Sequence, residues 1–185
     1  MNNTLSPLSP LTEVIRTRRQ AALRRRDSVG LLVNSLLTVV LAVVFVLLFL
    51  LFFHLRIVEG DDMYPSLSDG DLVLCCGERD YRKGDIVRYT ADGDERFGRV
   101  MAKGGDQVRL TPEGALLVNG TTQNYEIIFP TYPVNGEETA VTVPADSFFV
   151  LGDYRTEAAD SRQFGCISQD DVRDKVIVLL RHRKL

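Results

Sequence analysis

The side chains best suited to chemistry lie in a short polar segment that follows a long apolar run. Asp61, Asp62 and Ser66 stand close together in the sequence, and carboxylates and hydroxyls serve enzymes as bases and nucleophiles. Two acidic side chains act as an aspartic dyad only when both carboxylates share one proton. Because adjacent side chains of an extended segment point to opposite sides, Asp61 and Asp62 are not expected to form such a dyad.

A serine nucleophile needs a neighbouring base, and the sequence offers few. Ser66 and Ser161 are candidate hydroxyls, yet no motif places a lysine or histidine beside either of them. The two histidines are His54, next to the apolar run, and His182, in the C-terminal tail. The chain therefore lacks the obvious parts of a Ser-His-Asp arrangement. We also expect no metal ion, no cofactor and no nucleic-acid partner.

The apolar run itself predicts a membrane helix. It extends from Leu31 to Phe53 and is broken only by Asn34, Ser35 and Thr38. At a rise of ~1.5 Å per residue, this length crosses a hydrocarbon core of ~30 Å. Residues 54–56 follow it in place of a small-residue cleavage site, so we expect an uncleaved anchor.

The charges on either side of the run predict its orientation. Residues 1–56 contain seven arginines and two acidic residues, whereas the remainder has 15 basic and 23 acidic residues. The positive-inside rule then places the N-terminus in the cytoplasm of a single-pass cell-membrane protein. We expect a cytoplasmic basic tail at 1–29, a transmembrane helix at 30–54 and an extracytoplasmic domain at 55–185.

Two parts of the basic tail have separate expectations. Residues 1–12 are rich in proline, serine and threonine and are expected to be disordered. Residues 13–26 either form a short basic helix against anionic headgroups or act only as a topology signal.

Beyond the anchor, the pattern is typical of a mainly β domain. Short apolar runs alternate with glycine, proline and asparagine turn signals. The expected strands lie at 71–75, 84–89, 96–101, 148–151 and 176–180, and residues 116–122 are expected to form a strand that enters a hairpin turn. Residues 125–140 are expected to form an irregular small cap, and residues 168–171 a turn or helix start.

The cysteines predict no disulfide framework. Cys75 and Cys76 are adjacent and cannot bridge each other without strain, and Cys166 leaves an odd number. We expect all three to be small buried residues of the β domain.

Several motifs of this domain follow one another in the order found in a known family. They lie at 60–67, 68–71, 83–87, 98–106, 118–120, 143–144 and 152–162. This series resembles type I signal peptidases, the membrane-bound Ser/Lys endopeptidases that remove signal peptides. The resemblance implies a β-barrel-like ectodomain with a reduced cap.

The same resemblance assigns roles to individual positions. Asp62 stands where the family has its nucleophilic serine, Gly98 where it has the lysine base, and Ala158 where a serine orients that lysine. Tyr154 replaces a family asparagine. The retained residues are interpreted as architectural, with an ion pair expected between Asp160 and Arg162; they are Pro65, Arg99, Asp106, Asp153, Asp160 and Arg162.

These replacements remove the expected chemistry. Gly98 has no proton acceptor, and a carboxylate at Asp62 would repel the oxyanion of a tetrahedral intermediate. Lys103 lies five residues after Gly98, and this odd separation places it on the opposite strand face unless a bulge intervenes.

Three functions stay open from the sequence. We favour a non-catalytic homologue that binds a secreted partner such as a pilin, because proteins without the Ser/Lys pair resemble the signal peptidase-like factors of Gram-positive pilus clusters, which act beside a sortase. The alternative is an active endopeptidase that processes signal peptides with a rearranged site. A purely structural membrane tether is the third.

The altered positions predict a groove that differs from that of the family in width and charge. Replacement of a lysine by Gly98 is expected to widen a pocket, and Asp62 to make one end negative. That carboxylate is satisfied by an internal cation such as Arg99, by water, or by a cation of the partner. The expected groove residues are Asp62, Met63, Tyr64, Pro65, Gly98 and Arg99.

Overall fold

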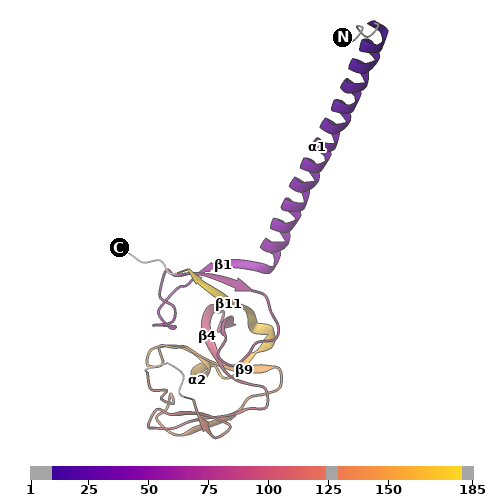
Figure 1. The fold of residues 1–185 in the computed structure, drawn as a ribbon. Coiled ribbons are helices and arrows are strands. Elements are labelled where there is room, and N and C mark those ends of the chain that lie inside the picture. Colours follow the sequence, from indigo (N-terminus) through magenta and orange to yellow (C-terminus); the bar gives the residue numbers. More distant parts are fainter. Residues whose placement is uncertain (1–9, 124–128, 181–185) are drawn as a thin grey trace, which may run out of the picture. The chain divides into compact units, whose positions relative to one another are not determined.

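The computed structural model describes residues 10–123 and 129–180. Its first element is a single helix, α1 (Pro10–Phe52), shown in indigo in Figure 1. The segment Gly30–Phe52 has a mean hydropathy of 3.1 and is long enough to cross a membrane, which makes it a candidate anchor. The helix ends two residues before the expected boundary at 54, because β1 (Phe53–Ile57) begins directly after it.

The basic segment belongs to the same helix. Residues 13–26, expected as a short basic helix or a topology signal, lie within α1. Of the tail expected to be disordered, residues 10–12 begin the helix, and residues 1–9 lie outside the described part of the chain.

The remainder is a mainly β unit, as the sequence predicted, and every strand pair is antiparallel. Its further elements are β2 (Leu72–Cys76), β3 (Ile86–Ala91), β4 (Asp94–Lys103), β5 (Gln107–Leu110), β6 (Leu116–Val118), β7 (Thr121–Thr122), β8 (Thr139–Thr142), β9 (Ser147–Leu151), α2 (Ser161–Phe164), β10 (Ile167–Ser168), η1 (Gln169–Asp171) and β11 (Val172–Leu180). The larger sheet has the order β1-β2-β11-β3-β4-β9-β10, and the smaller one β7-β6-β5-β8.

Strand β4 contributes side chains to two hydrophobic cores. Val100 packs with β3 and β9 side chains, whereas Met101 and Ala102 pack in a second core beneath the smaller sheet. A bulge against β9 between Val100 and Ala102 makes this possible, since the extra residue reverses which side chains face each side. A third core, built partly from Met63 and Leu67, holds the segment after β1.

Some elements differ from the expected pattern. The strands β1, β5, β8 and β10 and the short helix α2 were not predicted, and β8 lies at the end of the region expected to be an irregular cap. Part of that region, residues 124–128, lies outside the described residues. The hairpin turn after β6 and the turn at η1 lie where the sequence placed them.

The cysteines are free thiols, as expected. Cys75 is buried, while Cys76 and Cys166 are partly exposed. Burial, reinforced by the nearby Asp174 carboxylate, raises the pKa of the Cys75 thiol to about 12. It is therefore a packing residue with no thiolate at neutral pH.

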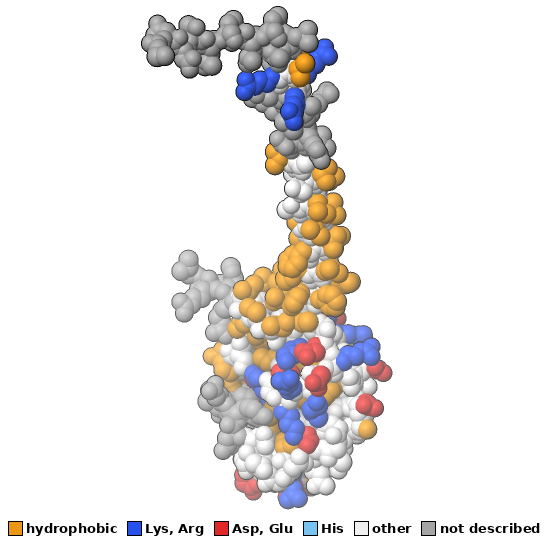
Figure 2. Space-filling view, turned by 45° about the vertical axis from the view of Figure 1, so that its right-hand side comes forward, with side chains coloured by type: hydrophobic (Ala, Val, Ile, Leu, Met, Phe, Trp, Pro, Cys, Tyr) orange, Lys and Arg blue, Asp and Glu red, His pale blue; other side chains and the backbone are white. Residues whose placement is uncertain are grey.

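One sheet face at β1, β2 and β11 is apolar and largely exposed. The register aligns Leu55 with Leu74 and Ile57 with Leu72, and β11 adds Val178 beside Leu74. Figure 2 shows this hydrophobic surface in orange on the β unit. Its first strand follows the candidate anchor directly in the sequence.

Candidate functional site

The structure brings the three altered positions together around Gly152. A Cβ atom built on Gly152 would lie 2.6 Å from the carbonyl oxygen of Asp62 and would also strike the Ala158 side chain. One built on Gly98 would lie 3.4 Å from the neighbouring Leu151 carbonyl. The close approach of these backbones therefore requires glycine at position 152.

The segment that carries Asp62 is a series of turns and not an extended strand. The Tyr64 amide donates to the Asp61 carbonyl at 2.9 Å, and the Leu67 amide donates to the Met63 carbonyl at 3.0 Å. Met63 is only 1% exposed, so it anchors the segment in the core and is not accessible as a groove residue. The expected extended geometry is wrong here because these turn hydrogen bonds curl the chain.

The two acidic side chains still have separate surroundings. An oxygen of Asp61 accepts from the Asp69 amide at 3.3 Å, and the Asp61 side chain is exposed. Asp62 lies instead against Arg96, with 3.6 Å between Oδ2 and Nη1. No dyad is indicated by these contacts, although the physical reason is turn geometry and not strand alternation.

The internal cation beside Asp62 is Arg96, and not Arg99 as expected. Burial raises the pKa of Asp62; the Arg96 charge opposes this shift, and Asp160 and Asp61 reinforce it. Arg99 is unavailable because its Nε donates to Asp153 at 2.8 Å. The carboxylate at the former nucleophile position is thus held, loosely, by its own chain.

Arg96 is itself only partly satisfied. Its Nη2 donates to Asp94 at 3.3 Å, and its guanidinium lies 5.2 Å from the centre of the Phe164 ring. Its Nε is buried and has no hydrogen-bond partner among the described residues. The guanidinium is therefore held through its two terminal nitrogens and one ring face, and its Nε donor has no described acceptor.

Tyr89 lies directly opposite Arg96 in the β3–β4 register and is fully buried. Its hydroxyl has no hydrogen-bond partner within the described part of the chain. Burial raises its pKa; the charge of Asp160 adds to this shift and that of Arg96 opposes it. The phenol is thus a neutral donor located beside an acidic and basic cluster.

The pocket expected beside Gly98 is not wide at that residue. A Cβ on Gly98 would collide with Cγ1 of Val150 and lie 2.9 Å from Cε1 of Tyr89. Both side chains are fully buried. The expectation of a widened pocket is wrong at this point because Tyr89 and Val150 occupy the space beside the glycine.

The retained charges form well-paired contacts around the site. Arg99 donates to Asp153, which is fully buried, and to the Gly84 carbonyl at 2.8 Å. The expected Asp160–Arg162 ion pair is present at 2.8 Å, and Asp160 also accepts from the Gly152 amide at 3.1 Å. These pairs fix the backbone that surrounds Gly152.

Asp106 supports the opposite end of β4. It accepts from the Lys103 amide at 2.7 Å and the Asn119 side chain at 2.7 Å, and pairs with Lys83 at 2.9 Å. Burial alone would raise the pKa of Asp106, but these three partners outweigh it and lower the pKa. The role of Asp106 is to hold the turn after β4.

The displaced nucleophile and base candidates are engaged elsewhere. Ser66 accepts from Arg99 at 3.2 Å, and the buried Ser161 hydroxyl accepts from the Val150 amide at 2.9 Å. The bulge that would allow Lys103 to face the same side as Gly98 is present in β4. Lys103 nevertheless lies near Asp80, 3.6 Å away, at the far end of the strand.

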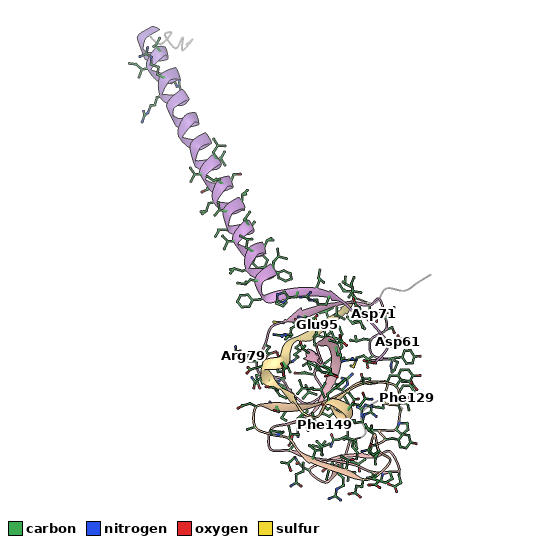
Figure 3. All side chains as sticks on the ribbon, turned by 180° about the vertical axis from the view of Figure 1, so that it is seen from behind. Asp61, Asp71, Arg79, Glu95, Phe129 and Phe149 are labelled. Carbon is green, nitrogen blue, oxygen red and sulfur yellow. The ribbon has the colours of Figure 1, made fainter. Side chains whose placement is uncertain are left out.

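Aromatic side chains border the site. Tyr154 lies 5.9 Å from the Tyr64 ring and 4.9 Å from the Phe129 ring, and its amide donates to the Asp62 carbonyl at 2.9 Å. Figure 3 shows Asp61 and Phe129 on the same side of the β unit, with Phe149 in its interior. Tyr64 is exposed and Tyr154 is partly exposed, so this side of the site has an accessible aromatic border.

A buried arginine ties the segment after residue 128 to this border. Arg155 is 3% exposed and donates to Thr131 at 2.7 Å. Burial lowers its pKa to about 10, although Asp153 opposes the shift. The hydrogen bond keeps Thr131 beside the last motif.

Sequence reasoning missed Arg96, Tyr89 and Phe164. Arg96 could have been found, since it lies two residues before Gly98 and so shares its strand face. Tyr89 and Phe164 required the register of β3 against β4 and the position of α2. Among the described residues no group of three or more His, Cys, Asp or Glu side chains could hold a metal ion.

The described structure is thus a mainly antiparallel β unit that follows an apolar N-terminal helix, as the sequence predicted. A family model described as signal peptidase, peptidase S26, matches residues 31–180. The chain belongs to this signal peptidase family, and the resemblance inferred from the sequence is confirmed.

The chain is also similar to individual proteins. Signal peptidase IB of Staphylococcus aureus is 31% identical over 140 residues, which cover 64% of this chain and 73% of that protein. Signal peptidase I T of Bacillus subtilis is 29% identical over 135 residues, covering 65% and 69%. A crystal structure of a signal peptidase I from Enterococcus faecalis is 22% identical and covers 54% of this chain and 97% of that one, with a TM-score of 0.45.

Proposed function

We propose that this chain is a membrane-anchored, non-catalytic member of the signal peptidase family that binds segments of secreted proteins. One observation carries the proposal: at the position of the family nucleophile, the Asp62 carboxylate is held by Arg96 of the same chain. The position of the family base is Gly98, and the volume beside it is filled by Tyr89 and Val150.

This arrangement lacks the groups that serine peptide hydrolysis requires. A serine must lose its proton to a nearby base as it attacks, and an oxyanion must then be stabilised by donors. Asp62 offers a carboxylate where the oxyanion would form. Ser66 accepts from Arg99, whose guanidinium stays protonated and cannot act as a base, and Ser161 accepts from the Val150 amide. Loss of several members of one catalytic unit removes nearly all of its rate enhancement.

The binding role follows from what the domain keeps. Its ion pairs preserve the backbone around Gly152, and Tyr64 and Tyr154 form an accessible aromatic border. We propose that the helix anchors the domain outside the cell membrane with the N-terminus in the cytoplasm. By family resemblance, a pilin-like secreted protein is the proposed partner, beside a sortase.

The rearranged-peptidase alternative is less well supported. It would require Lys103, Ser66 or Ser161 to act near Asp62, but each of these side chains has a different partner. Asp62 as a general base would have to release Arg96 first.

The test is a cleavage assay with the purified full chain in detergent micelles and a preprotein that carries a signal peptide. We expect no cleavage, while a catalytically competent signal peptidase assayed in parallel cleaves. Cleavage that persists after purification and is lost in Asp62→Asn would contradict the proposal.

A variant in which the family's Ser, Lys and Ser are restored provides a second test. It combines Asp62→Ser, Gly98→Lys and Ala158→Ser with Val150→Ala, because a lysine at position 98 needs the space that Val150 occupies. Cleavage by this variant alone would show that the scaffold is competent and that the four altered side chains account for the inactivity.

A further inference from the structure

A polar cavity of about 370 Å³ lies beside the loop that follows β2. It is lined by residues of this loop, 77–81, and by residues of the segment 169–173, which comprises η1 and the start of β11. None of its lining residues belongs to the altered centre around Gly152. Figure 3 shows Arg79 and Asp61 on opposite sides of the β unit, so the cavity is a separate feature.

Tyr81 lines this cavity although it is only 2% exposed. Its ring is held by an edge-to-face contact with Phe148, with 5.6 Å between the ring centres. The Tyr81 hydroxyl has no hydrogen-bond partner among the described residues, but unlike the Tyr89 hydroxyl it is not one of the fully enclosed polar atoms. A largely buried polar group normally has a partner, and a ligand in the cavity can reach this one.

The Tyr81 hydroxyl is a neutral donor. Burial raises its pKa, and the charges of Asp174 and Glu78 add to this shift. Both carboxylates have cations of their own. Asp174 accepts from Arg88 at 2.6 Å. Glu78 lies 3.8 Å from Lys175. The phenol therefore keeps a proton that it can donate to a ligand at neutral pH.

Two arginines line the same cavity with guanidinium nitrogens that are unused in the described structure. Arg79 makes no ion pair with a described residue, and the Arg173 side chain makes one long hydrogen bond there, 3.4 Å from Nε to Thr90. The Arg79 carbonyl accepts from the Gln169 side chain at 3.1 Å, which ties the loop to η1. The cavity thus combines two guanidinium groups with a loop that is held in place.

These donors select an oxyanion as the ligand. The lining charges are Arg79 and Arg173 against Glu78 and Asp170, and Lys175 partly neutralises Glu78. With Lys175 included, three cations face two carboxylates, so an anion is favoured over a cation. A phosphate group has three or more acceptor oxygens and can accept from donors on different elements at once, whereas a carboxylate has only two oxygens.

We propose that this cavity is a phosphate site in which Tyr81, Arg79 and Arg173 donate to the oxygens of one phosphate group. A lipid headgroup is one source of that phosphate, because Phe53, the first residue after the candidate anchor, pairs with Cys76 and the loop follows directly. A soluble phosphate is the other source. The site shares no residue with the altered centre and does not depend on the proposed function.

The test uses the full chain, inorganic phosphate as the probe and isothermal titration calorimetry in a Tris-chloride buffer. In dodecyl maltoside micelles, which contain no phosphate, we expect saturable binding and a higher unfolding midpoint, because the ligand binds the folded state. The same titration is then made in nanodiscs of phosphatidylglycerol and phosphatidylcholine. Loss of binding there would identify a headgroup phosphate as the occupant, and unchanged binding would identify a soluble phosphate.

Four variants test the assigned donors. Tyr81→Phe keeps the ring and removes the hydroxyl, and it is expected to weaken phosphate affinity about tenfold, as for a hydrogen bond to a charged group. Arg79→Gln and Arg173→Gln are each expected to weaken it by a similar factor. Asp170→Asn removes a repelling charge and is expected to strengthen binding about twofold.

Two further variants are matched controls. Tyr89→Phe removes a tyrosine hydroxyl that is fully enclosed and out of reach of a ligand. Arg109→Gln removes an exposed arginine of β5 that lines a different cavity. Both are expected to leave phosphate affinity unchanged, and unfolding midpoints measured without phosphate show that each variant is folded.

Several results would overturn the inference. These are no saturable binding in micelles, or equal affinity in the wild type and Tyr81→Phe. Equal weakening in Arg79→Gln and Arg109→Gln would show that phosphate responds only to net charge, and would also overturn it. Cleavage of a preprotein would contradict the non-catalytic function alone, since it leaves these affinities untouched.

Discussion

The ion-paired frame around Gly152 and the altered centre beside it differ in how completely their polar groups are satisfied. In the frame, Asp153 and Asp160 are fully buried, and each accepts direct hydrogen bonds from an arginine. At the centre, Asp62 is half-buried and has a loose contact to Arg96, while the hydroxyl of Tyr89 has no described partner.

This difference shows that the groups that support the backbone are distinct from the groups at the positions of the nucleophile and the base. The frame orders the loops through contacts that do not involve a nucleophile or base, so it can persist when both are absent. At the centre, Asp62, Gly98 and Ala158 stand where the family pattern has its Ser, Lys and Ser, and the space is not filled with apolar side chains alone. Its unsatisfied polar atoms distinguish it from the frame, where each buried carboxylate has an arginine partner.

The largest expected effect comes from breaking the frame. Arg99→Ala leaves the buried Asp153 carboxylate without its cation and is expected to lower the free energy of unfolding by about 3–5 kcal/mol. Arg96→Ala is expected to cost about 1 kcal/mol, because its carboxylate partners are partly exposed. Urea unfolding of the full chain in micelles measures both.

The control for the Arg99→Ala and Arg96→Ala variants is Arg109→Ala. Arg109 and Glu138 are both more than half exposed and lie 3.3 Å apart, so a change below about 0.5 kcal/mol is expected. Equal losses in the Arg99 and Arg96 variants would remove the distinction between frame and centre.

The second prediction concerns packing beside the former base. Gly98→Ala is expected to destabilise the domain by about 1–3 kcal/mol, because its methyl group would meet Val150 and Tyr89. Gly77→Ala is the matched control, since nothing lies within 4 Å of a Cβ there. Thermal unfolding compares the two.

A double variant tests the cause. If Val150 is the obstacle, Gly98→Ala combined with Val150→Ala should cost less than the sum of the two single changes. Additive losses would show that the strain in Gly98→Ala arises elsewhere.

The sequence predicted the frame better than the centre. Asp160 and Arg162 are two residues apart and match a family motif, so their pair was predictable from local order. Arg96 was overlooked because its importance depends on Asp62, which lies in a distant loop whose turns were read as extended chain. The space beside Gly98 depends on the rotamers of Val150 and Tyr89, which no spacing rule specifies.

The third prediction uses pH to contrast Asp62 of the centre with Asp106, a well-paired carboxylate at the far end of β4. The lowered pKa of Asp106 means that its contribution to stability is present above the ordinary pKa of aspartate and is lost as pH falls through the folded value. Asp106→Asn is therefore expected to cost about 1 kcal/mol at neutral pH and less in acid.

The contribution of Asp62 to stability depends on pH with the opposite sign. Because its pKa is raised, its contribution is present below the ordinary pKa and is lost as pH rises through the folded value. Relative to the wild type, the free energy of unfolding of Asp62→Asn is expected to be higher at neutral pH than in acid. The change with pH is expected to be smaller than for Asp106→Asn, because the Asp62 side chain is partly exposed. Parallel pH profiles for the two variants would contradict the assigned shifts.

The smallest effect is expected for Lys103, which the β4 bulge turns toward the side of Gly98. Its ammonium lies 3.6 Å from the exposed Asp80, and such surface pairs contribute little. Lys103→Ala is expected to change the free energy of unfolding by less than about 0.5 kcal/mol. It should also leave the preprotein assay unchanged, because the strand between positions 98 and 103 holds the amine away from Asp62. A protein whose residual cleavage disappears in Lys103→Ala, with normal unfolding, would instead show that the bulge supplies a replacement base and that the altered centre is a working peptidase site.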